Sequence, residues 1–532
     1  MFDYFVVQIK KNCLLIFKYI ILLVVLWILN LSVPFLSGLY MDYIVGQLKS
    51  NVLFIFVFLI AAANLFHMVF RYFQVIISTR LNNTLTYKIS NGLFQKIFKS
   101  SYEEYSSLDS AYLVDQISKD SHAVVRFFMN NIVNFFLQVG TILMSAFIIF
   151  KADVILSIAI FSLLPFYIIT FNVHKEKMYK TKNDYKQEMN IYFSKYSEQI
   201  TKLSYIKRNV LAQEMEKRFN DAFKKMLNAS LLSVRTDYIF MNINQFIIII
   251  SYICIIAIGG IKVSAGELSI GYFSIINTYF NMVLHSVSYF LGLAGTYHET
   301  MIAIKRINKI LNSSEEMNGD VKLHKIRRLD VVNLSIQFDS YALIRNFNFR
   351  FDVGYIYGIR GKNGCGKSTF LNTLVGICPG QYEGSIFYDG IELSNLDMQM
   401  LRRKKISFLE QEPVMLSMTV EQYLKYGIEM TVQSSAFQEK MLVTWGLSQL
   451  KDKEINENGS NLSGGEKKKL ALIRCLSKES DLIILDEPTS SLDQDSILVL
   501  VNFLKGIKKE TIVLVVTHDD FILDNCDQII DL

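Results

Sequence analysis

The chain of 532 residues is too long for a single hydrophobic core, and at about 150 residues per domain it predicts three or four structural units. Hydrophobic residues make up 51% of the sequence and charged residues 20%, and the mean hydropathy is +0.28. This composition excludes an ordinary soluble protein and indicates an integral membrane protein with a soluble domain. The net charge of +6 fits the Lys and Arg excess of cytoplasmic loops, so no nucleic-acid partner is expected.

The N-terminal apolar run is predicted to be a retained first membrane span. Lys10 and Lys11 precede a stretch that continues through Tyr40, which is too long for the core of a signal peptide. The cysteines show neither metal-binding nor disulfide spacing, so reduced thiols are expected. They are Cys13, Cys254, Cys365, Cys378, Cys475 and Cys526.

Hydropathy over windows of about twenty residues predicts six membrane spans. They cover about 14–40, 52–76, 132–150, 154–172, 239–259 and 269–293. The connections 77–131 and 173–238 are long and polar, and the second is rich in Lys and Arg. The positive-inside rule therefore places these loops and both termini in the cytoplasm. Because the loops contain almost no Gly or Pro and space their apolar residues as helices do, we expect helices to continue from the membrane into the cytosol.

Polar residues recur on one face of the sixth expected span. They are Ser274, Asn277, Asn281, His285 and Ser288, at three- and four-residue intervals. Such a stripe serves either hydrogen bonding between helices or the lining of a substrate cavity. At 1.5 Å per residue, His67 and His285 lie about 22 and 24 Å from the outer ends of their spans. The residues hypothesised to face a central cavity are His67, Asn277, Asn281 and His285.

The texture of the sequence changes after the sixth span to short, β-rich runs. We predict a transmembrane domain at 1–312, a linker at 313–324 and an α/β domain at 325–532. Within the last of these, Val353–Gly361 is predicted to be a buried strand that enters the Gly-rich loop GKNGCGKST, and a helix follows. This strand, loop and helix form the context that a phosphate-binding loop requires.

The Gly-rich loop is predicted to bind the phosphates of a nucleotide. Its backbone N–H groups from about Asn363 to Ser368 would form an anion-binding nest at a helix N-terminus. Lys367 would reach the outer phosphates, and the Ser368 hydroxyl would be a magnesium ligand. The expected binding residues are Gly361, Asn363, Gly364, Cys365, Gly366, Lys367, Ser368 and Thr369. Because Cys365 lies inside this loop, we expect thiol reagents to block it and MgATP to protect it.

Two further apolar runs end in polar residues. LIILDEP is predicted to be a buried parallel strand, after which Asp486 would bind magnesium, commonly through water, and Glu487 would act as the general base. Adjacent residues on a strand point in opposite directions, so the two carboxylates can have different roles. LVVTHDD repeats the pattern and places His518 at the carboxyl end of another strand, where such sheets bind ligands.

The motif LSGGEKKKLALIRC begins about a hundred residues after the phosphate loop. With the preceding motifs, it makes residues 325–532 resemble the nucleotide-binding domain of an ATP-binding cassette (ABC) transporter. The resemblance implies that Gln411 senses magnesium and couples to the membrane domain, and that Asp493 ends the D-loop. It implies that Phe338, or alternatively Tyr341, stacks on adenine, and that Glu457 senses the membrane domain. The implied signature residues are Ser463, Gly464, Gly465 and Glu466.

The membrane half is similar to the six-span domain of ABC exporters, through KVSAGELSIGYFSIINTYF and IAIKRINKIL. The resemblance implies coupling helices near 106–113 and 204–211, and a location in the cell membrane with the nucleotide-binding domain in the cytoplasm. In this family, each nucleotide lies between one copy's phosphate loop and the other copy's signature. We therefore expect a dimer, most simply a homodimer, although a degenerate partner chain stays an alternative.

The sequence departs from the family pattern in three ways, of which the last bears on the substrate. The signature ends in Glu466 rather than Gln, the adenine platform is Phe338 rather than Tyr, and the chain ends fourteen residues after His518. Compact cassettes with a His-Asp-Asp ending resemble exporters of cyclic or modified peptides and of siderophores, so a peptide substrate is expected. No peptidase domain precedes the first span, so leader cleavage would need another protein. Multidrug export, lipid flipping, and an ATP-gated channel or sensory regulator are the alternatives.

Overall fold

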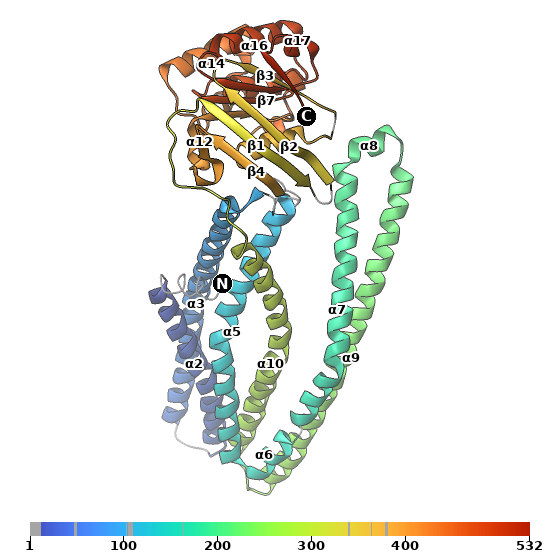
Figure 1. Ribbon diagram of the computed structural model, residues 1–532. Helices are drawn as coiled ribbons and strands as arrows, with labels where there is room; N and C mark the ends of the chain where they lie inside the picture. Colours follow the sequence, from blue (N-terminus) through green and yellow to red (C-terminus); the bar gives the residue numbers. More distant parts are fainter. Residues whose placement is uncertain are drawn as a thin grey trace. The chain divides into compact units, whose positions relative to one another are not determined.

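The computed structural model describes residues 12–46, 50–102, 104, 110–162, 164–338, 341–362, 364–377 and 381–532. The chain divides into two compact units (Figure 1). We call the first the helical unit, comprising Met1–Phe94 and Ala111–Leu311. We call the second the α/β unit, comprising Gln95–Ser110 and Asn312–Leu532.

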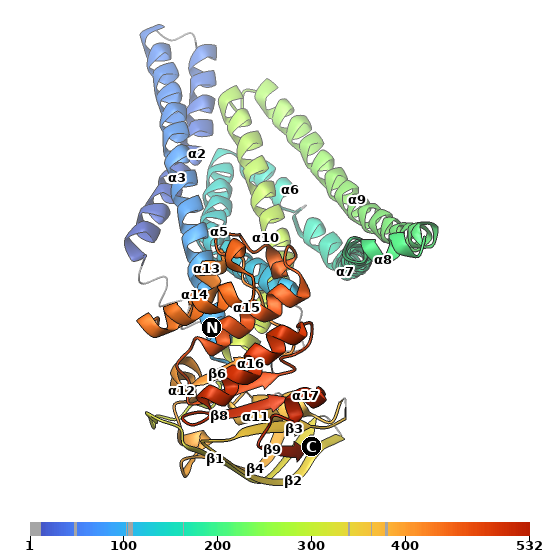
Figure 2. The same cartoon turned by 90° about the horizontal axis from the view of Figure 1, so that it is seen from above.

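Long helices build the helical unit, and two of them cross its sequence boundaries. They are α2 (Cys13–Val45), α3 (Ser50–Lys99), α5 (Ser110–Ala152), α6 (Val154–Phe161), α7 (Leu164–Thr201), α8 (Leu203–Arg208), α9 (Ala212–Ser264) and α10 (Ile270–Leu311). The helices α2 and α3 lie side by side in both views (Figures 1 and 2). The helices α7 and α9 form an antiparallel pair that α8 joins at one end. Continuous helices therefore follow the expected membrane spans into the polar loops, as their spacing predicts.

Among the described residues, four helices are long and apolar enough to cross a membrane. They cover Cys13–Val45, Val52–Lys99, Gln116–Ala152 and Ala212–Ser264. The fourth expected span, 154–172, is predicted as one helix but is interrupted, because α6 ends at Phe161 and α7 begins at Leu164. The sixth falls on α10, whose polar stripe makes it less apolar. The count of six spans therefore stays a prediction.

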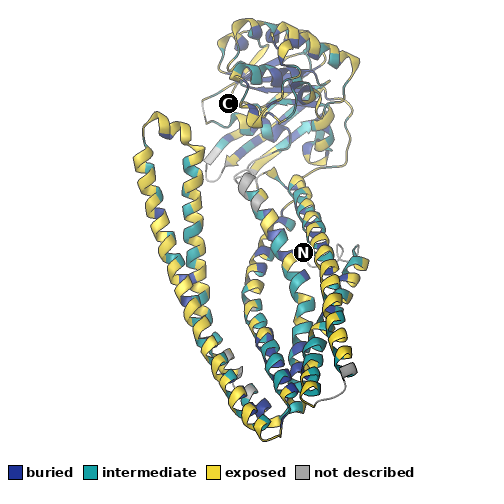
Figure 3. Cartoon of the chain, turned by 180° about the vertical axis from the view of Figure 1, so that it is seen from behind, coloured by how far each residue is buried: buried dark blue, intermediate teal, exposed yellow. Residues whose placement is uncertain are grey.

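The helical unit exposes many large apolar side chains. On α3, Phe54 is 73% exposed and Phe58 is 71% exposed, and exposed positions run along α3, α7 and α9 (Figure 3). Apolar surface of this extent is unfavourable in water and is expected where helices face lipid. The helices keep their backbone hydrogen bonds internal, which satisfies the polar groups of the chain inside a bilayer.

Small residues and polar pairs join α10 to its neighbours. A Cβ atom at Gly38 of α2 would collide with Ile275 of α10, so the two helices pack closely at this glycine. The N-terminus of α10 is capped by Asp42, which accepts from the Ser269 hydroxyl at 2.7 Å and from the Gly271 N–H at 2.6 Å. Further along α10, the Ser286 hydroxyl donates to Gln138 of α5 at 2.6 Å. Residues beside the predicted polar stripe of α10 thus serve helix association.

The α/β unit contains two sheets. Its strands are β1 (Arg328–Phe338), β2 (Tyr341–Asp352), β3 (Ile356–Arg360), β4 (Gln381–Tyr388), β5 (Ile391–Glu392), β6 (Ile406–Leu409), β7 (Leu482–Asp486), β8 (Ile512–Val516) and β9 (Gln528–Asp531). The first sheet is antiparallel in the order β2-β1-β4-β5, and the second is parallel in the order β6-β7-β8-β3-β9. The strands β7 and β8 are buried along their whole length, which explains their continuous apolar sequences.

The register of the parallel sheet brings three strand ends to one level. Val516, the last residue of β8, pairs with Asp486 of β7 and with Ile359 of β3. The residues that follow these strands therefore emerge together at the carboxyl edge of the sheet. This edge is where open α/β sheets bind their ligands.

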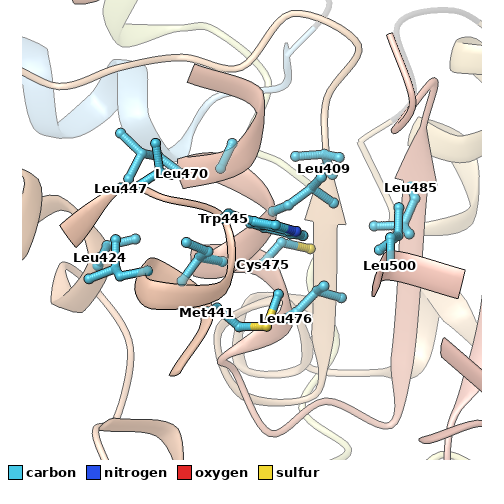
Figure 4. Packing of buried hydrophobic residues seen from close by; sticks show 14 of the residues in the cluster. Leu409, Leu424, Met441, Trp445, Leu447, Leu470, Cys475, Leu476, Leu485 and Leu500 are labelled. Atoms are coloured by element: carbon cyan, nitrogen blue, oxygen red, sulfur yellow. The ribbon is translucent and has the colours of Figure 1, made fainter. Parts of the chain in front are cut away.

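Helices cover the parallel sheet and form a small subdomain beside it. They are α11 (Lys367–Leu374), α12 (Met398–Lys404), α13 (Val420–Lys425), α14 (Val432–Thr444), α15 (Gly464–Leu476), α16 (Gln494–Ile507) and α17 (Asp520–Leu523). In the core beneath α15, the Trp445 ring lies close to Leu409 and Cys475 (Figure 4). This buried cluster fixes α15 against β6 and so positions the start of the signature helix.

The expected linker forms backbone hydrogen bonds with segments that precede it and segments that follow it in the sequence. At its start, the Glu316 N–H donates to the Lys99 carbonyl at 2.8 Å, and Ser100 forms a β-bridge with Glu315. Further on, the Val321 N–H donates to the Asn395 carbonyl at 3.0 Å. The sequence assigns residues 95–110 to the transmembrane domain, but these contacts group them with the α/β unit. The difference arises because such pairings join distant segments and leave no local pattern.

Candidate functional site

The phosphate loop connects β3 to α11 as its sequence predicts. Gly364 and Gly366 have φ values of +83° and +100°, a region that glycine adopts without strain. A Cβ atom at Gly366 would also lie 3.0 Å from the Cβ of Leu343, so a larger residue would crowd β2. The loop thus needs its glycines for shape and for space. Asn363 lies outside the described residues.

Lys367 starts α11 and turns its amine toward the loop. The Nζ atom donates to the carbonyls of Gly361 at 2.8 Å and Lys362 at 3.2 Å, and lies 3.2 Å from the His518 Nε2. The phosphate loop and the segment that follows β8, which are distant in sequence, therefore meet at one ammonium group. Beside it, the Cys365 sulfur lies against Gly361, where an added Cβ would be 2.8 Å from it.

Ser368 and Asp486, both expected to bind magnesium, are hydrogen-bonded to each other. The Ser368 hydroxyl donates to Asp486 Oδ2 at 2.7 Å. Asp486 ends β7 and is only 4% exposed, and this burial raises the pKa of its carboxyl group. A hydroxyl, a carboxylate and the nearby amide of Gln411 offer the oxygen ligands that Mg²⁺ prefers, so these residues fit that ion.

Glu487 leaves the strand that precedes it. The sequence predicts alternating strand geometry through both carboxylates, but β7 ends at Asp486 and Glu487 has a φ value of +46°. Its N–H donates to the Val516 carbonyl at 2.9 Å, and its Oε1 lies 3.8 Å from the His518 Nε2. A non-glycine residue in this region carries about 1–3 kcal/mol of strain, which is typical of functional sites.

These side chains line one cavity of about 510 Å³ at the carboxyl edge of the parallel sheet. Its lining residues are Leu343, Gly364, Gly366, Lys367, Ser368, Thr369, Gln411, Asp486 and Glu487. Leu343, which lies on β2, was not predicted. Phe338 ends β1, and its side chain lies outside the described part of the structure, as does that of Tyr341.

The signature residues lie at the start of α15 and do not line this cavity. Ser463 caps the helix: the Glu466 N–H donates to its hydroxyl at 3.2 Å, and the Glu466 carboxylate accepts from the Ser463 N–H at 2.7 Å. This capping box gives Glu466 a structural role that a Gln side chain can also perform. Ser463 and Gly464 are exposed, so the helix N-terminus is available to an anion from outside.

The D-loop packs against the signature of the same chain. A Cβ atom at Gly465 would lie 2.9 Å from the carbonyl of Ser491, so only glycine fits there without a shift. Asp493 accepts from Lys469 of α15 at 2.7 Å and from the Ser496 hydroxyl at 2.8 Å. These two bonds hold the pKa of the Asp493 carboxyl well below its usual range. Asp493 therefore stays charged and joins the D-loop to α15.

Comparison with known families decides the identity of this arrangement. The family described as ABC transporter transmembrane region matches residues 16–287, more than half of the chain, and the family described as ABC transporter matches residues 344–490. The chain belongs to the ABC transporter family. It joins one helical membrane domain to one nucleotide-binding domain, which is the architecture of a half-transporter.

Known exporters are similar along most of the chain. The ATP-dependent lipid A-core flippase of Syntrophus aciditrophicus is 24% identical over 473 residues, which are 87% of this chain and 78% of that protein. A multidrug export ATP-binding/permease protein of Staphylococcus aureus is 23% identical over 464 residues, 84% of this chain and 79% of the relative. The solved structure of a bacterial Atm1-family ABC exporter with ATP bound matches with a TM-score of 0.84 at 17% identity, covering 98% and 93% of the two chains. This ABC transporter is a membrane protein with the exporter fold.

In this exporter, the predicted substrate-cavity residues have diverse environments. Asn281 of α10 accepts a hydrogen bond from the Tyr252 hydroxyl of α9, and its amide donates to the Asn277 carbonyl at 3.0 Å. His67 is half-buried and His285 is exposed. None of these four lines the cavity of about 570 Å³ between α2, α5 and α10, or that of about 280 Å³ between α7, α9 and α10. Their role in the exporter stays a prediction.

The two expected coupling helices are described to different extents. The range 204–211 coincides with α8 (Leu203–Arg208), a short basic helix between α7 and α9. The range 106–113 includes residues 106–109, which lie outside the described residues. Both assignments remain predictions for the exporter.

Proposed function

We propose that this ABC exporter binds and hydrolyses MgATP at the carboxyl edge of its parallel sheet. The observation that carries the proposal is the meeting of Lys367, Asp486 and Glu487 at one cavity, with His518 in contact with two of them. Lys367 would neutralise charge on the outer phosphates, and the glycine-shaped loop would present its N–H groups to them.

The remaining roles follow from the chemistry of each side chain. Ser368, Gln411 and Asp486, the last through water, would hold Mg²⁺. When bound, this ion would neutralise charge that develops on the phosphates. Glu487 would accept a proton from the attacking water, and His518 would orient the phosphate and the carboxylate. The strained backbone of Glu487 supports its assignment as the base, because its side chain enters the cavity only after the strand has ended.

We infer that each site is completed by a second copy of the chain. Ser463 and Gly464 are exposed at a helix N-terminus and lie outside the cavity of their own chain. In the proposed dimer, the partner's Ser463 and Gly464 would contact the nucleotide bound to Lys367. Binding would draw the two nucleotide-binding domains together, and hydrolysis would release them, which would drive alternate access of the membrane domains.

We propose that the transported substrate is amphipathic. The sequence-based expectation is a peptide, whereas similarity to a lipid A-core flippase and to a multidrug export protein favours lipids or drugs. The cavity between α2, α5 and α10 supports an apolar component, because it is lined mainly by leucine and aromatic side chains, with Lys151 as its charged residue. Export of a modified peptide and flipping of a lipid both agree with this chemistry.

Transport in vesicles tests the proposal. The chain is reconstituted in lipid nanodiscs, and ATP hydrolysis is measured with peptides, drugs and lipids; the best stimulator is then followed in inside-out vesicles. We expect MgATP-dependent uptake that the Glu487→Gln variant lacks while it still binds ATP. Stimulated hydrolysis without uptake, combined with an ATP-dependent ion conductance, would instead support a channel or regulator.

A further inference from the structure

Lys468 is a buried lysine in the signature helix. It follows Ser463 by five positions on α15 and is 2% exposed, which is rare for a lysine without polar partners. Its Nζ donates to the Gln411 carbonyl at 2.8 Å and lies 3.5 Å from the Glu410 carbonyl. An ammonium group is unfavourable in the protein interior unless such bonds offset its lost hydration.

The neighbouring lysines point elsewhere and provide a comparison. Lys467 donates to the Asn458 carbonyl at 3.0 Å, ahead of the signature, and Lys469 pairs with Asp493 of the D-loop. Successive helical residues are about 100° apart around the axis, so three consecutive lysines bind three different segments. Of these three, it is Lys468 that contacts the segment carrying Gln411.

We propose that Lys468 is a positioning residue that fixes the backbone of Gln411 and thereby the approach of its side chain to the magnesium site. This inference rests on the proposed function. Gln411 is exposed and follows β6 by two residues, so its backbone lies outside the sheet. The bond from Lys468 restrains this backbone. Lys468 joins that backbone to the helix whose N-terminus presents Ser463.

The consequence is a link between the two nucleotide sites of the proposed dimer. Gln411 serves the site of its own chain, whereas Ser463 serves the site of the partner chain. Because Lys468 binds both elements in one chain, a shift of α15 on engaging the partner's nucleotide would carry the Gln411 backbone with it. Groups that hydrogen-bond to metal ligands commonly contribute 10–100-fold to metal affinity or activity.

The test compares Lys468→Met with Lys467→Met, the same change one position earlier. First, backbone amide exchange is measured on the nucleotide-free full-length protein, in peptides that cover residues 406–416. We expect Lys468→Met to accelerate exchange at Gln411 and Glu412, and Lys467→Met to leave it unchanged. Second, ATP hydrolysis is measured against Mg²⁺ concentration below the melting temperature of every variant. The half-saturating Mg²⁺ concentration should rise about 10-fold in Lys468→Met, and Lys468→Arg should recover most of it.

A purely structural lysine would give another result. If Lys468→Met lowers the melting temperature but leaves both local exchange and half-saturating Mg²⁺ at wild-type values, the positioning role is wrong. If Lys468→Met does not fold, the same two measurements on Lys468→Gln decide between a positioning role and a purely structural role. Failure of the proposed function is distinct, because the wild-type protein itself would then show no Mg²⁺-dependent ATP hydrolysis.

Discussion

Neighbouring carboxylates at the end of β7 differ because the strand ends between them. Asp486 keeps strand geometry, is buried and accepts from Ser368, whereas Glu487 has a φ value of +46° and faces the cavity. The sequence motif predicts a role for each of the two carboxylates. It does not predict the backbone change, since a positive φ at a glutamate arises from tertiary contacts such as the bond from its N–H to Val516.

Asp486→Asn should stabilise the nucleotide-free protein while it removes activity. Burial raises the pKa of Asp486, so its charged form is disfavoured in the folded state. A carboxyl group with a raised folded pKa destabilises the protein as the pH rises above its unfolded pKa of about 3.9, and has no effect below it. We expect the variant to melt higher at pH 7, and the difference to vanish toward pH 3.5. Equal melting temperatures at pH 7 would contradict this account.

Cys365 makes the phosphate loop a target for thiol reagents. Its sulfur is partly accessible beside Gly361, inside the segment that would bind phosphate. We expect N-ethylmaleimide to inhibit ATP hydrolysis, MgATP to slow this inhibition, and the Cys365→Ser variant to resist the reagent. The buried Cys475 should not react in the folded protein, because burial raises the pKa of its thiol to about 12. Inhibition of the Cys365→Ser variant at the wild-type rate would exclude this site.

At the scale of elements, the sequence predicts the positions of helices better than it predicts where helices are interrupted. The fourth expected span is continuously apolar in sequence, yet α6 ends at Phe161, four residues before Pro165. Proline removes one helical hydrogen bond and its ring clashes with the carbonyl four residues earlier, which explains the break. This signal was present in the sequence. The register that aligns β3, β7 and β8 has no such local signal, because parallel strands are paired by long-range contacts.

An ion pair at the start of the expected linker yields a stability prediction. Glu316 pairs with Arg402, whose guanidinium also donates to the Val375 carbonyl at 3.0 Å, just after α11. Both side chains of the pair are about one-fifth exposed, at 19% and 20%. Glu316→Ala should therefore destabilise the α/β unit by about 1–3 kcal/mol, as loss of a charged hydrogen bond in a partly buried site does.

Glu315 provides the matched control for this change. It is the same residue type one position earlier, but its side chain is 62% exposed in its pair with Lys96. Such a surface pair contributes about 0–1 kcal/mol. Thermal unfolding and protease cleavage near residue 316 should thus change in Glu316→Ala and change little in Glu315→Ala. Equal effects of both substitutions would show that the partly buried pair of Glu316 contributes no more to stability than the exposed pair of Glu315.

At the scale of the whole molecule, the two halves of the proposed nucleotide site lie on different parts of the chain. The cavity carries Lys367 and Glu487, and the exposed start of α15 carries Ser463 and Gly464. Family and architecture follow from sequence motifs, because their spacing is set by chemistry. The substrate does not follow from them, since membrane helices with different cargoes share the same apolar composition.

Complementation between two inactive chains tests the central claim most directly. One chain carries Lys367→Ala, and the other carries Gly464→Asp, which the fold should accept because a Cβ atom at Gly464 meets only the Ser491 side chain, at 3.6 Å and beyond. Each variant alone should lose ATP hydrolysis, because every composite site lacks one half. Purified mixed dimers, isolated with two tags, should recover up to about half of the wild-type rate, since one of two symmetric sites is intact. Mixed dimers that stay inactive, or a Gly464→Asp dimer with the wild-type rate, would contradict a site shared between chains.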